Sequence, residues 1–207
     1  MDRLEKLKKE QEKLARKISL KDAFEEINLI AGCDINYYEN TIIVGFIIFK
    51  GDEIIEKSNE IREVKFPYKP GFLSYREAPS ILEAYYKLKH EPDLIMITRN
   101  GVMHPRRFGL ASHIGIALDK PVIGVSKTLL YGEVKDGKVY DDDKLIGYEL
   151  RIKEQSNPIY VSPGNKVSMK TALEIVKNNI KNHKLPEYLH IVHKYTNKIK
   201  KDYRFKA

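Results

Sequence analysis

The pattern of apolar and polar residues divides the first third of the chain into one helix and three strands. Over residues 3–18, leucines and an isoleucine recur at helical spacing among lysines and glutamates, which predicts an amphipathic helix. Three strand-like apolar runs follow at 28–38, 41–50 and 53–65, and two residues separate each run from the next. Links this short predict antiparallel pairing, so the three runs should form a meander.

Beyond residue 66, helical and strand-like patterns alternate. The loop expected at 66–73 holds two prolines and a glycine. Helical spacing occurs at 76–90, 106–118, 169–182 and 187–201, and short apolar runs typical of buried strands occur at 93–98, 121–126 and 157–162. Residues 135–138 carry an Asp-Gly pair that predicts a hairpin turn. Hairpins followed by alternating strands and helices predict an α/β fold, with a mixed central sheet flanked by helices.

Composition favours a globular protein. The chain of 207 residues is 42% hydrophobic and 32% charged, which suits one domain over 1–207, with an N-terminal helix at 1–20 and a loose basic tail at 202–207. Its single cysteine, Cys33, excludes an intrachain disulfide and favours a reducing compartment. A spanning run of about 18 apolar residues is missing, and the start of the chain does not resemble a signal peptide. We therefore expect a cytoplasmic monomer without a membrane partner.

The net charge of the chain bears on the class of partner that it binds. The formal net charge is +8 and the pI is about 9.3. An excess of positive charge favours a polyanion such as nucleic acid, because phosphate contacts release counterions. A generally lysine-rich composition is the alternative explanation.

Two acidic residues occupy positions where chemistry is conceivable. Asp34 lies inside an apolar strand, where a carboxylate is costly unless it is paired or binds a metal. Alternatively, Asp34 faces solvent from a half-exposed strand. Glu77 follows Arg76 near a helix start, where a glutamate also complements the helix dipole.

Two loops add candidates for nucleic-acid contacts. Tyr68 lies in the proline-flanked loop 67–73, where an aromatic side chain can wedge into a base stack or simply cover the core. The segment 98–107 follows a buried strand and carries His104, Arg106 and Arg107. Two arginines at the start of a helix suit a phosphate, whereas His104 can contact a base edge or cap the helix.

Two further positions carry basic side chains. Lys127 ends the apolar strand at 121–126, where a lysine can meet a phosphate or simply face solvent. His190 and His193 are three residues apart on one helix face, so that paired metal ligation is conceivable, although a surface histidine is more common.

Several ordered segments together resemble the endonuclease V family. They are Gly32-Cys33-Asp34, Pro67-Tyr68-Lys69-Pro70, Gly71-Phe72-Leu73-Ser74-Tyr75-Arg76-Glu77, the stretch from Gly101 to Gly109, Ile123-Gly124-Val125-Ser126-Lys127, Val161-Ser162-Pro163-Gly164 and Leu185-Pro186-Glu187. The resemblance covers roughly residues 28–195. It identifies the chain as a divergent member.

The resemblance implies a ribonuclease H-like fold and a function in DNA repair or RNA processing. Family members use magnesium, for which manganese can substitute, to hydrolyse the second phosphodiester 3′ to inosine in DNA or RNA. By resemblance, the catalytic residues are Asp34, Glu77, Lys127 and His193, and the metal ligands include Asp34 and Glu77. The substrate-binding positions are Tyr68, Gly71, Leu73, Gly101, His104 and Arg106.

Two departures from the family pattern affect the site. Thr98 replaces an expected metal-binding aspartate and Arg99 replaces a glycine, while Asn165 replaces a histidine further on. Magnesium prefers anionic oxygen ligands, so Thr98 is a weak metal-binding candidate and metal affinity should fall. Two hypotheses follow: a slow, magnesium-dependent inosine endonuclease, or an inosine binder that has lost cleavage.

Overall fold

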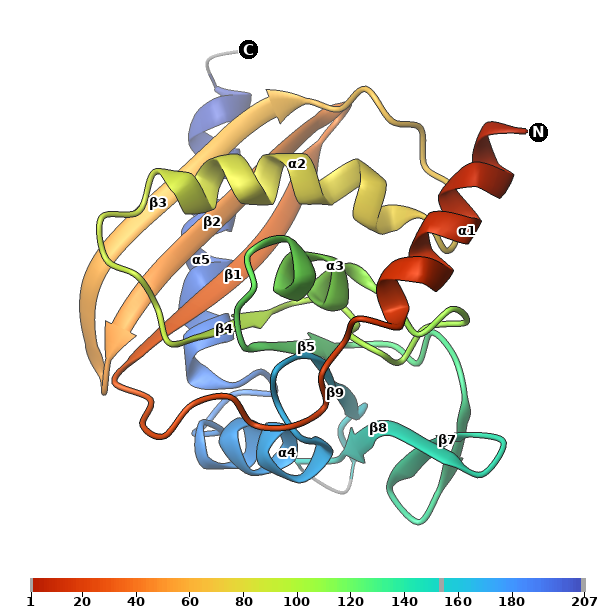
Figure 1. Ribbon diagram of the computed structural model, residues 1–207. Coiled ribbons are helices and arrows are strands. Elements are labelled where there is room, and N and C mark those ends of the chain that lie inside the picture. The colour runs from red at the N-terminus through yellow and green to blue at the C-terminus, as the bar shows by residue number, and fades with distance from the viewer. Residues whose placement is uncertain (1, 153–154, 206–207) are drawn as a thin grey trace.

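One large sheet organises the protein. The computed structural model describes residues 2–152 and 155–205. Over these residues, nine strands pair in the order β3-β2-β1-β4-β5-β9-β8-β7-β6. Helices lie against both faces of the sheet (Figure 1). This arrangement confirms the prediction of a mixed sheet flanked by helices.

The first half of the sheet is the predicted meander. Strands β1 (Leu29–Tyr38), β2 (Thr41–Lys50) and β3 (Glu53–Glu63) pair antiparallel in sequence order. Positive φ angles at Glu39 and Gly51 close the two short links between them. Glycine adopts such angles without steric cost, which suits Gly51 to its turn.

Two short parallel strands form the centre of the sheet. Strand β4 (Leu94–Ile97) runs parallel to β1, and β5 (Val122–Ser126) runs parallel to β4. Alternate β4 residues belong to different hydrophobic cores, with Ile95 in one and Met96 in the other. Burial on both faces explains why these segments are apolar throughout.

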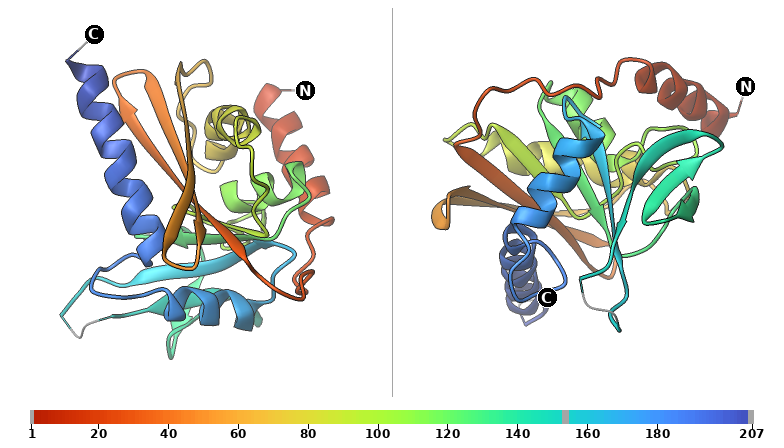
Figure 2. Two further views of the ribbon diagram at one scale, coloured as in Figure 1. Left: turned by 90° about the vertical axis from the view of Figure 1, so that its left-hand side faces the viewer. Right: turned by 90° about the horizontal axis from the view of Figure 1, so that it is seen from below.

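The helices form a layer on each side of the sheet. In Figure 2, left, α5 (Glu187–Arg204) lies on one side of the meander, while α2 (Leu73–Tyr86) and α3 (Leu110–Ala117) lie on the other. Helix α4 (Met169–Asn178) packs in the same core as α5. Helix α1 (Arg3–Ala15) contacts α3. The described helices include none with the length and hydropathy needed to cross a bilayer.

The second half of the sheet holds strands that the pattern only partly predicts. Strands β6 (Glu133–Lys135) and β7 (Lys138–Asp141) form the expected hairpin, with positive φ angles at its Asp-Gly turn. Strand β8 (Lys144–Leu150) was not predicted. Strand β9 (Ile159–Asn165) extends three residues beyond the predicted 157–162, because Pro163 and Asn165 continue its pairing with β5.

Several predicted helix boundaries are wrong. Helix α1 ends at Ala15 and α4 at Asn178, both earlier than expected, and α2 spans Leu73–Tyr86 rather than 76–90. Helix α3 begins at Leu110 rather than 106, because Arg107 has a φ of 55° that a right-handed helix cannot accommodate. Helix α5 continues to Arg204, so the start of the expected loose tail is helical, and 206–207 lie outside the described residues.

Candidate functional site

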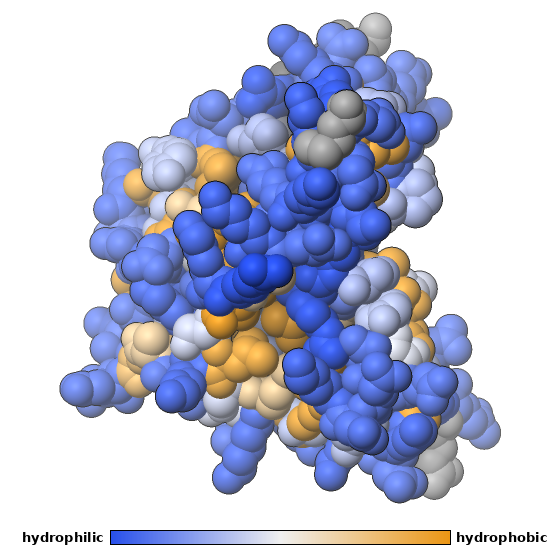
Figure 3. All heavy atoms as spheres, turned by 45° about the vertical axis from the view of Figure 1, so that its right-hand side comes forward, coloured by the Kyte–Doolittle hydropathy of each residue, from blue (hydrophilic) through white to orange (hydrophobic). Residues whose placement is uncertain are grey.

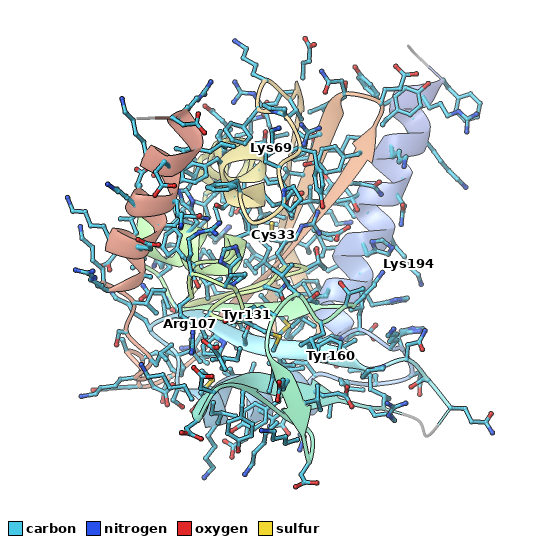
Figure 4. The ribbon with its side chains drawn as sticks, turned by 90° about the vertical axis from the view of Figure 1, so that its right-hand side faces the viewer. Cys33, Lys69, Arg107, Tyr131, Tyr160 and Lys194 are labelled. Carbon is cyan, nitrogen blue, oxygen red and sulfur yellow. The ribbon has the colours of Figure 1, made fainter. Side chains whose placement is uncertain are left out.

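A cavity of about 460 Å³ opens where β4 and β5 end beside β1 and α5. Figure 4 shows the loop with Lys69 and the segment with Tyr131 on opposite sides of Cys33, the neighbour of Asp34. Eight of the predicted site residues line the cavity: Asp34, Tyr68, Gly71, Leu73, Thr98, His104, Lys127 and His193. Three predicted residues, Glu77, Gly101 and Arg106, are not in its lining.

Asp34 is a buried carboxylate with three side-chain donors. Only 3% of the residue is exposed, so the solvent-facing alternative is wrong. Thr98 donates to Oδ1 at 2.6 Å, while Thr196 at 2.6 Å and His193 Nδ1 at 2.9 Å contact Oδ2. Burial alone would raise the pKa of Asp34, but the hydrogen bonds from His193, Thr196 and Thr98 outweigh it and lower the pKa. Asp34 is therefore ionised at neutral pH.

Backbone pairing brings Thr98 to Asp34. Cys33 lies opposite Ile97 in the parallel register of β1 and β4, and the Thr98 amide donates to the Cys33 carbonyl at 3.1 Å. The next side chain on each strand, Thr98 and Asp34, then meets at the end of the pair. Thr196 was missed by sequence reasoning, although it lies three residues after His193 and so shares its helix face.

Glu77 forms a buried ion pair behind the cavity. It is fully buried, and it receives two parallel hydrogen bonds from Arg99, Nε to Oε2 at 2.8 Å and Nη2 to Oε1 at 2.7 Å. Tyr37 donates to the same Oε1 at 3.0 Å. Burial works to lower the pKa of Arg99, but the charge and hydrogen bonds of Glu77, together with the charge of Asp34, outweigh burial and raise the pKa. The simple helix-dipole interpretation of Glu77 is therefore wrong.

This ion pair decides whether a magnesium ion fits. Magnesium requires near-octahedral oxygen ligands, of which one or two are usually carboxylates. Both oxygens of Glu77 accept hydrogen bonds from Arg99, and a threonine stands where a third acid would help. Across residues 2–152 and 155–205, no group of three or more His, Cys, Asp or Glu side chains could hold a metal. In this arrangement the residues do not form a magnesium site.

His104 fastens the loop that carries Tyr68 and Gly71. Its Nε2 lies 3.2 Å from the Gly71 carbonyl, and its Nδ1 accepts from the Arg106 amide at 3.2 Å. Burial, helped by the charge of Arg106, lowers the pKa of His104 to about 4. The ring is therefore neutral and donates through Nε2. It does not cap α3, whose N-cap position is Gly109.

We expect the protein to lose stability as the pH falls from about 6.5 towards about 4 because of His104. Its pKa is lower in the folded state than in the unfolded chain, so the unfolded chain binds more protons in this window. At about pH 5, this residue alone should reduce the free energy of unfolding by roughly 2 kcal/mol. Urea titrations at pH 7 and pH 5 measure the effect. His104→Gln keeps a donor for Gly71 and should show a smaller pH dependence; an unchanged pH dependence would contradict the assignment.

Arg106 holds the same loop from the other side. Its Nη2 donates to the Gly71 carbonyl at 2.5 Å, and its Nε donates to Gln11 Oε1 at 2.7 Å. Its guanidinium also lies 4.6 Å from the centre of the Phe72 ring. The expectation of a phosphate-binding helix start at Arg106 and Arg107 is therefore wrong, since α3 starts later and Arg107 pairs with Asp141 at 2.6 Å.

Gln11 was missed, although the sequence carries a signal for it. It falls on the apolar stripe of the first helix, between Leu7 and Leu14, and it is the one fully buried residue described in α1. Its Nε2 donates to the carbonyls of Gly71 and Phe108. A polar residue on an apolar stripe indicates a buried hydrogen bond, and here that bond ties α1 to the loop of the cavity.

The remaining predicted residues occupy different environments. Tyr68 is 68% exposed at the cavity, and Lys127 is also exposed there. His193 faces Asp34, but His190 stacks on His183 with ring centres 3.5 Å apart, so the two histidines of α5 do not converge on one ligand. Gly101 packs behind the cavity, where a Cβ would lie 2.1 Å from the Pro163 carbonyl oxygen.

Comparisons with known proteins agree on one family. The family model described as Endonuclease V matches residues 12–194. Endonuclease V of Dictyoglomus turgidum is 39% identical, over 91% of this chain and 87% of the relative. The Archaeoglobus fulgidus Endonuclease V is 34% identical, over 96% of this chain and 94% of the relative.

Solved structures show the same fold. The Bacillus subtilis Endonuclease V structure superposes with a TM-score of 0.91 at 29% identity, over 100% of this chain and 96% of that one. A Ciona intestinalis Endonuclease V, solved with a 24mer DNA containing an inosine followed by a ribo-adenosine, superposes with a TM-score of 0.85 at 23% identity, over 96% and 98% of the two chains. The chain therefore belongs to the endonuclease V family of nucleases and has its ribonuclease H-like fold.

Proposed function

We propose that this protein recognises inosine in a nucleic-acid strand and hydrolyses the second phosphodiester on its 3′ side. One observation carries the proposal: a single cavity is lined by the exposed Tyr68 and the loop at Gly71 as well as by Asp34, Lys127 and His193. A base and the phosphate beyond it can therefore be held together. The proposal covers deoxyinosine in DNA and inosine in RNA, because the loop residues would contact the base, which is the same in both.

The surface supports a polyanionic partner. The net charge is +8, and Figure 3 shows a largely hydrophilic face with apolar residues gathered near its centre. Basic side chains attract phosphates, while apolar and aromatic groups accept unstacked bases. The Ciona intestinalis relative in complex with inosine-containing DNA supports the same class of ligand.

The part of the cavity that holds Asp34 and His193 supports proton transfer. His193 Nδ1 lies 2.9 Å from the ionised Asp34, so Asp34 fixes the tautomer that leaves Nε2 free to accept a proton from water. The side chain of His193 is 37% exposed, which gives water access to it. Lys127, at the end of β5, can stabilise charge on the reacting phosphate. We expect slow cleavage, because Thr98 supplies a hydroxyl where an anionic metal ligand would act.

The pairing of Arg99 with Glu77 favours a second candidate function, an inosine-binding protein with no significant cleavage. Incubating inosine-containing single-stranded DNA and RNA with magnesium or manganese separates the two. The endonuclease cuts at the second phosphodiester, whereas the binder retains the strand intact.

We expect Tyr68→Ala to reduce the preference for inosine strands more than it reduces overall binding. Tyr68 is 68% exposed at the cavity, and stacking on an aromatic ring contributes about 1–3 kcal/mol per base. The preference should therefore fall by at most the roughly 5- to 150-fold that this stacking energy represents, measured as the ratio of dissociation constants for adenosine and inosine strands. Tyr86→Ala is the matched control, since Tyr86 is 70% exposed but lies outside the cavity lining. An unchanged ratio for Tyr68→Ala would assign Tyr68 a covering role only.

A further inference from the structure

Arg99 is a cation built into the cavity between the two acids. It lines the cavity with 24% of its side chain exposed, and it pairs with the buried Glu77. The charge of Asp34 also acts on Arg99 and contributes to its raised pKa. A single guanidinium therefore faces both carboxylates and the open cavity.

The hydrogen bonds of Arg99 leave donors for a ligand. A guanidinium has five N–H groups. Three donate within the protein: Nε and Nη2 to Glu77, and Nη1 to the Thr98 carbonyl at 2.8 Å. The two others, one on each terminal nitrogen, have no acceptor among the hydrogen bonds of the described residues. Because Glu77 and Thr98 fix the guanidinium plane, these two donors are pre-organised, and two such donors suit a phosphate.

Both acids at this point already have partners, which favours a phosphate over a divalent cation beside Arg99. Glu77 is neutralised by Arg99, and Asp34 already accepts hydrogen bonds from Thr98, Thr196 and His193. A divalent cation placed beside Asp34 would also lie near the guanidinium and be repelled by it. A phosphodiester there would instead meet Arg99 and Lys127, both of which line the cavity.

We propose that Arg99 is the phosphate-binding cation of this site, so that the protein binds a nucleic-acid strand without a divalent metal. The inference rests on the proposed function only for the class of ligand, a nucleic-acid strand. It assigns to Arg99 the charge neutralisation that a metal ion would otherwise provide.

The unmodified protein gives the first test. Fluorescence anisotropy measures the dissociation constant for a labelled inosine-containing single strand, in EDTA and in magnesium at matched ionic strength. We expect affinity in EDTA to equal or exceed affinity in magnesium, because magnesium only screens the phosphates. Binding that is tenfold tighter in magnesium would overturn the proposal. The comparison of EDTA with magnesium is repeated with a strand that carries adenosine in place of inosine. If the protein does not recognise inosine, this strand still shows whether binding depends on magnesium.

A pair of variants isolates Arg99. Arg99→Met alone would leave Glu77 as an unpaired buried charge and endanger folding. The comparison is therefore between Glu77→Gln and Glu77→Gln with Arg99→Met, both in EDTA. We expect the double variant to bind about tenfold more weakly, with a salt slope reduced by about one. Arg62→Met removes the same charge from β3, outside the cavity lining, and should have little effect. Equal affinity of the two Glu77→Gln variants would contradict the role of Arg99.

Discussion

Replacing Thr98 with aspartate and Arg99 with glycine should raise magnesium-dependent cleavage of an inosine-containing strand by at least about tenfold. Thr98 Oγ1 lies 2.6 Å from Asp34, so a carboxylate at position 98 would join Asp34 at one ion. Removing Arg99 frees Oε2 of Glu77 and leaves Oε1 with the Tyr37 hydroxyl as its described donor. Outer-shell changes at metal sites already alter affinity or activity by about 10–100-fold, and these residues would contact the ion directly.

Single-turnover cleavage rates over a magnesium series measure this gain. Thr98→Asp alone should gain less, because Arg99 can pair with the new carboxylate. Adding Asp34→Ala to the double variant should remove the gain, since both acids would share the ion. Circular dichroism checks that the variant is folded, because Glu77 loses its partner. A folded double variant with the rate and magnesium dependence of the parent protein would show that position 98 does not limit cleavage.

Gly101→Ala should destabilise the protein by about 3 kcal/mol, the upper part of the range for overpacking in a filled core. A Cβ at this position would lie 2.1 Å from the Pro163 carbonyl oxygen and 2.9 Å from the Gly164 amide nitrogen. Backbone atoms of a central strand cannot move aside as a flexible side chain can. The adjoining segment from Thr98 would have to shift, so nucleic-acid binding should weaken as well.

Urea denaturation measures the change in the free energy of unfolding. Gly51→Ala is a suitable control: its φ of 56° carries a strain of about 1 kcal/mol, but a Cβ there meets no heavy atom within 4 Å. The loss should therefore be clearly larger for Gly101→Ala than for Gly51→Ala. Comparable losses would mean that the packing of Gly101 against β9 is not tight.

The pattern of apolar residues predicts the architecture but not its irregular parts. The meander and the buried strands around Ile95 and Ile123 follow directly from continuous apolar runs. Strand β8 is missed because its burial is mixed along its length. The start of α3 is misplaced because Arg107 adopts a left-handed conformation, and its side chain pairs with Asp141 34 residues later, which no local pattern reveals.

The sequence predicts which residues lie at the site, but not which side chains they pair with. Motifs placed Asp34, Thr98 and His193 in one region, and the structure joins them by hydrogen bonds. The pairing of Arg99 with Glu77 was not predicted, because it connects the end of β4 to a helix 22 residues earlier in the chain. Resemblance likewise suggested direct substrate contact for Arg106, whereas its hydrogen bonds go to the loop that forms the cavity wall.

Binding to two single strands that differ only in one base tests the central claim most directly. One strand carries inosine and the other adenosine at the same position, and the dissociation constants are measured at moderate salt. If the cavity accepts an inosine base, the inosine strand should bind at least about tenfold more tightly, a difference of about 1.4 kcal/mol. Affinity for both strands should fall as salt rises, since phosphate contacts contribute to each. Equal affinity for the two strands would contradict recognition of inosine by this protein.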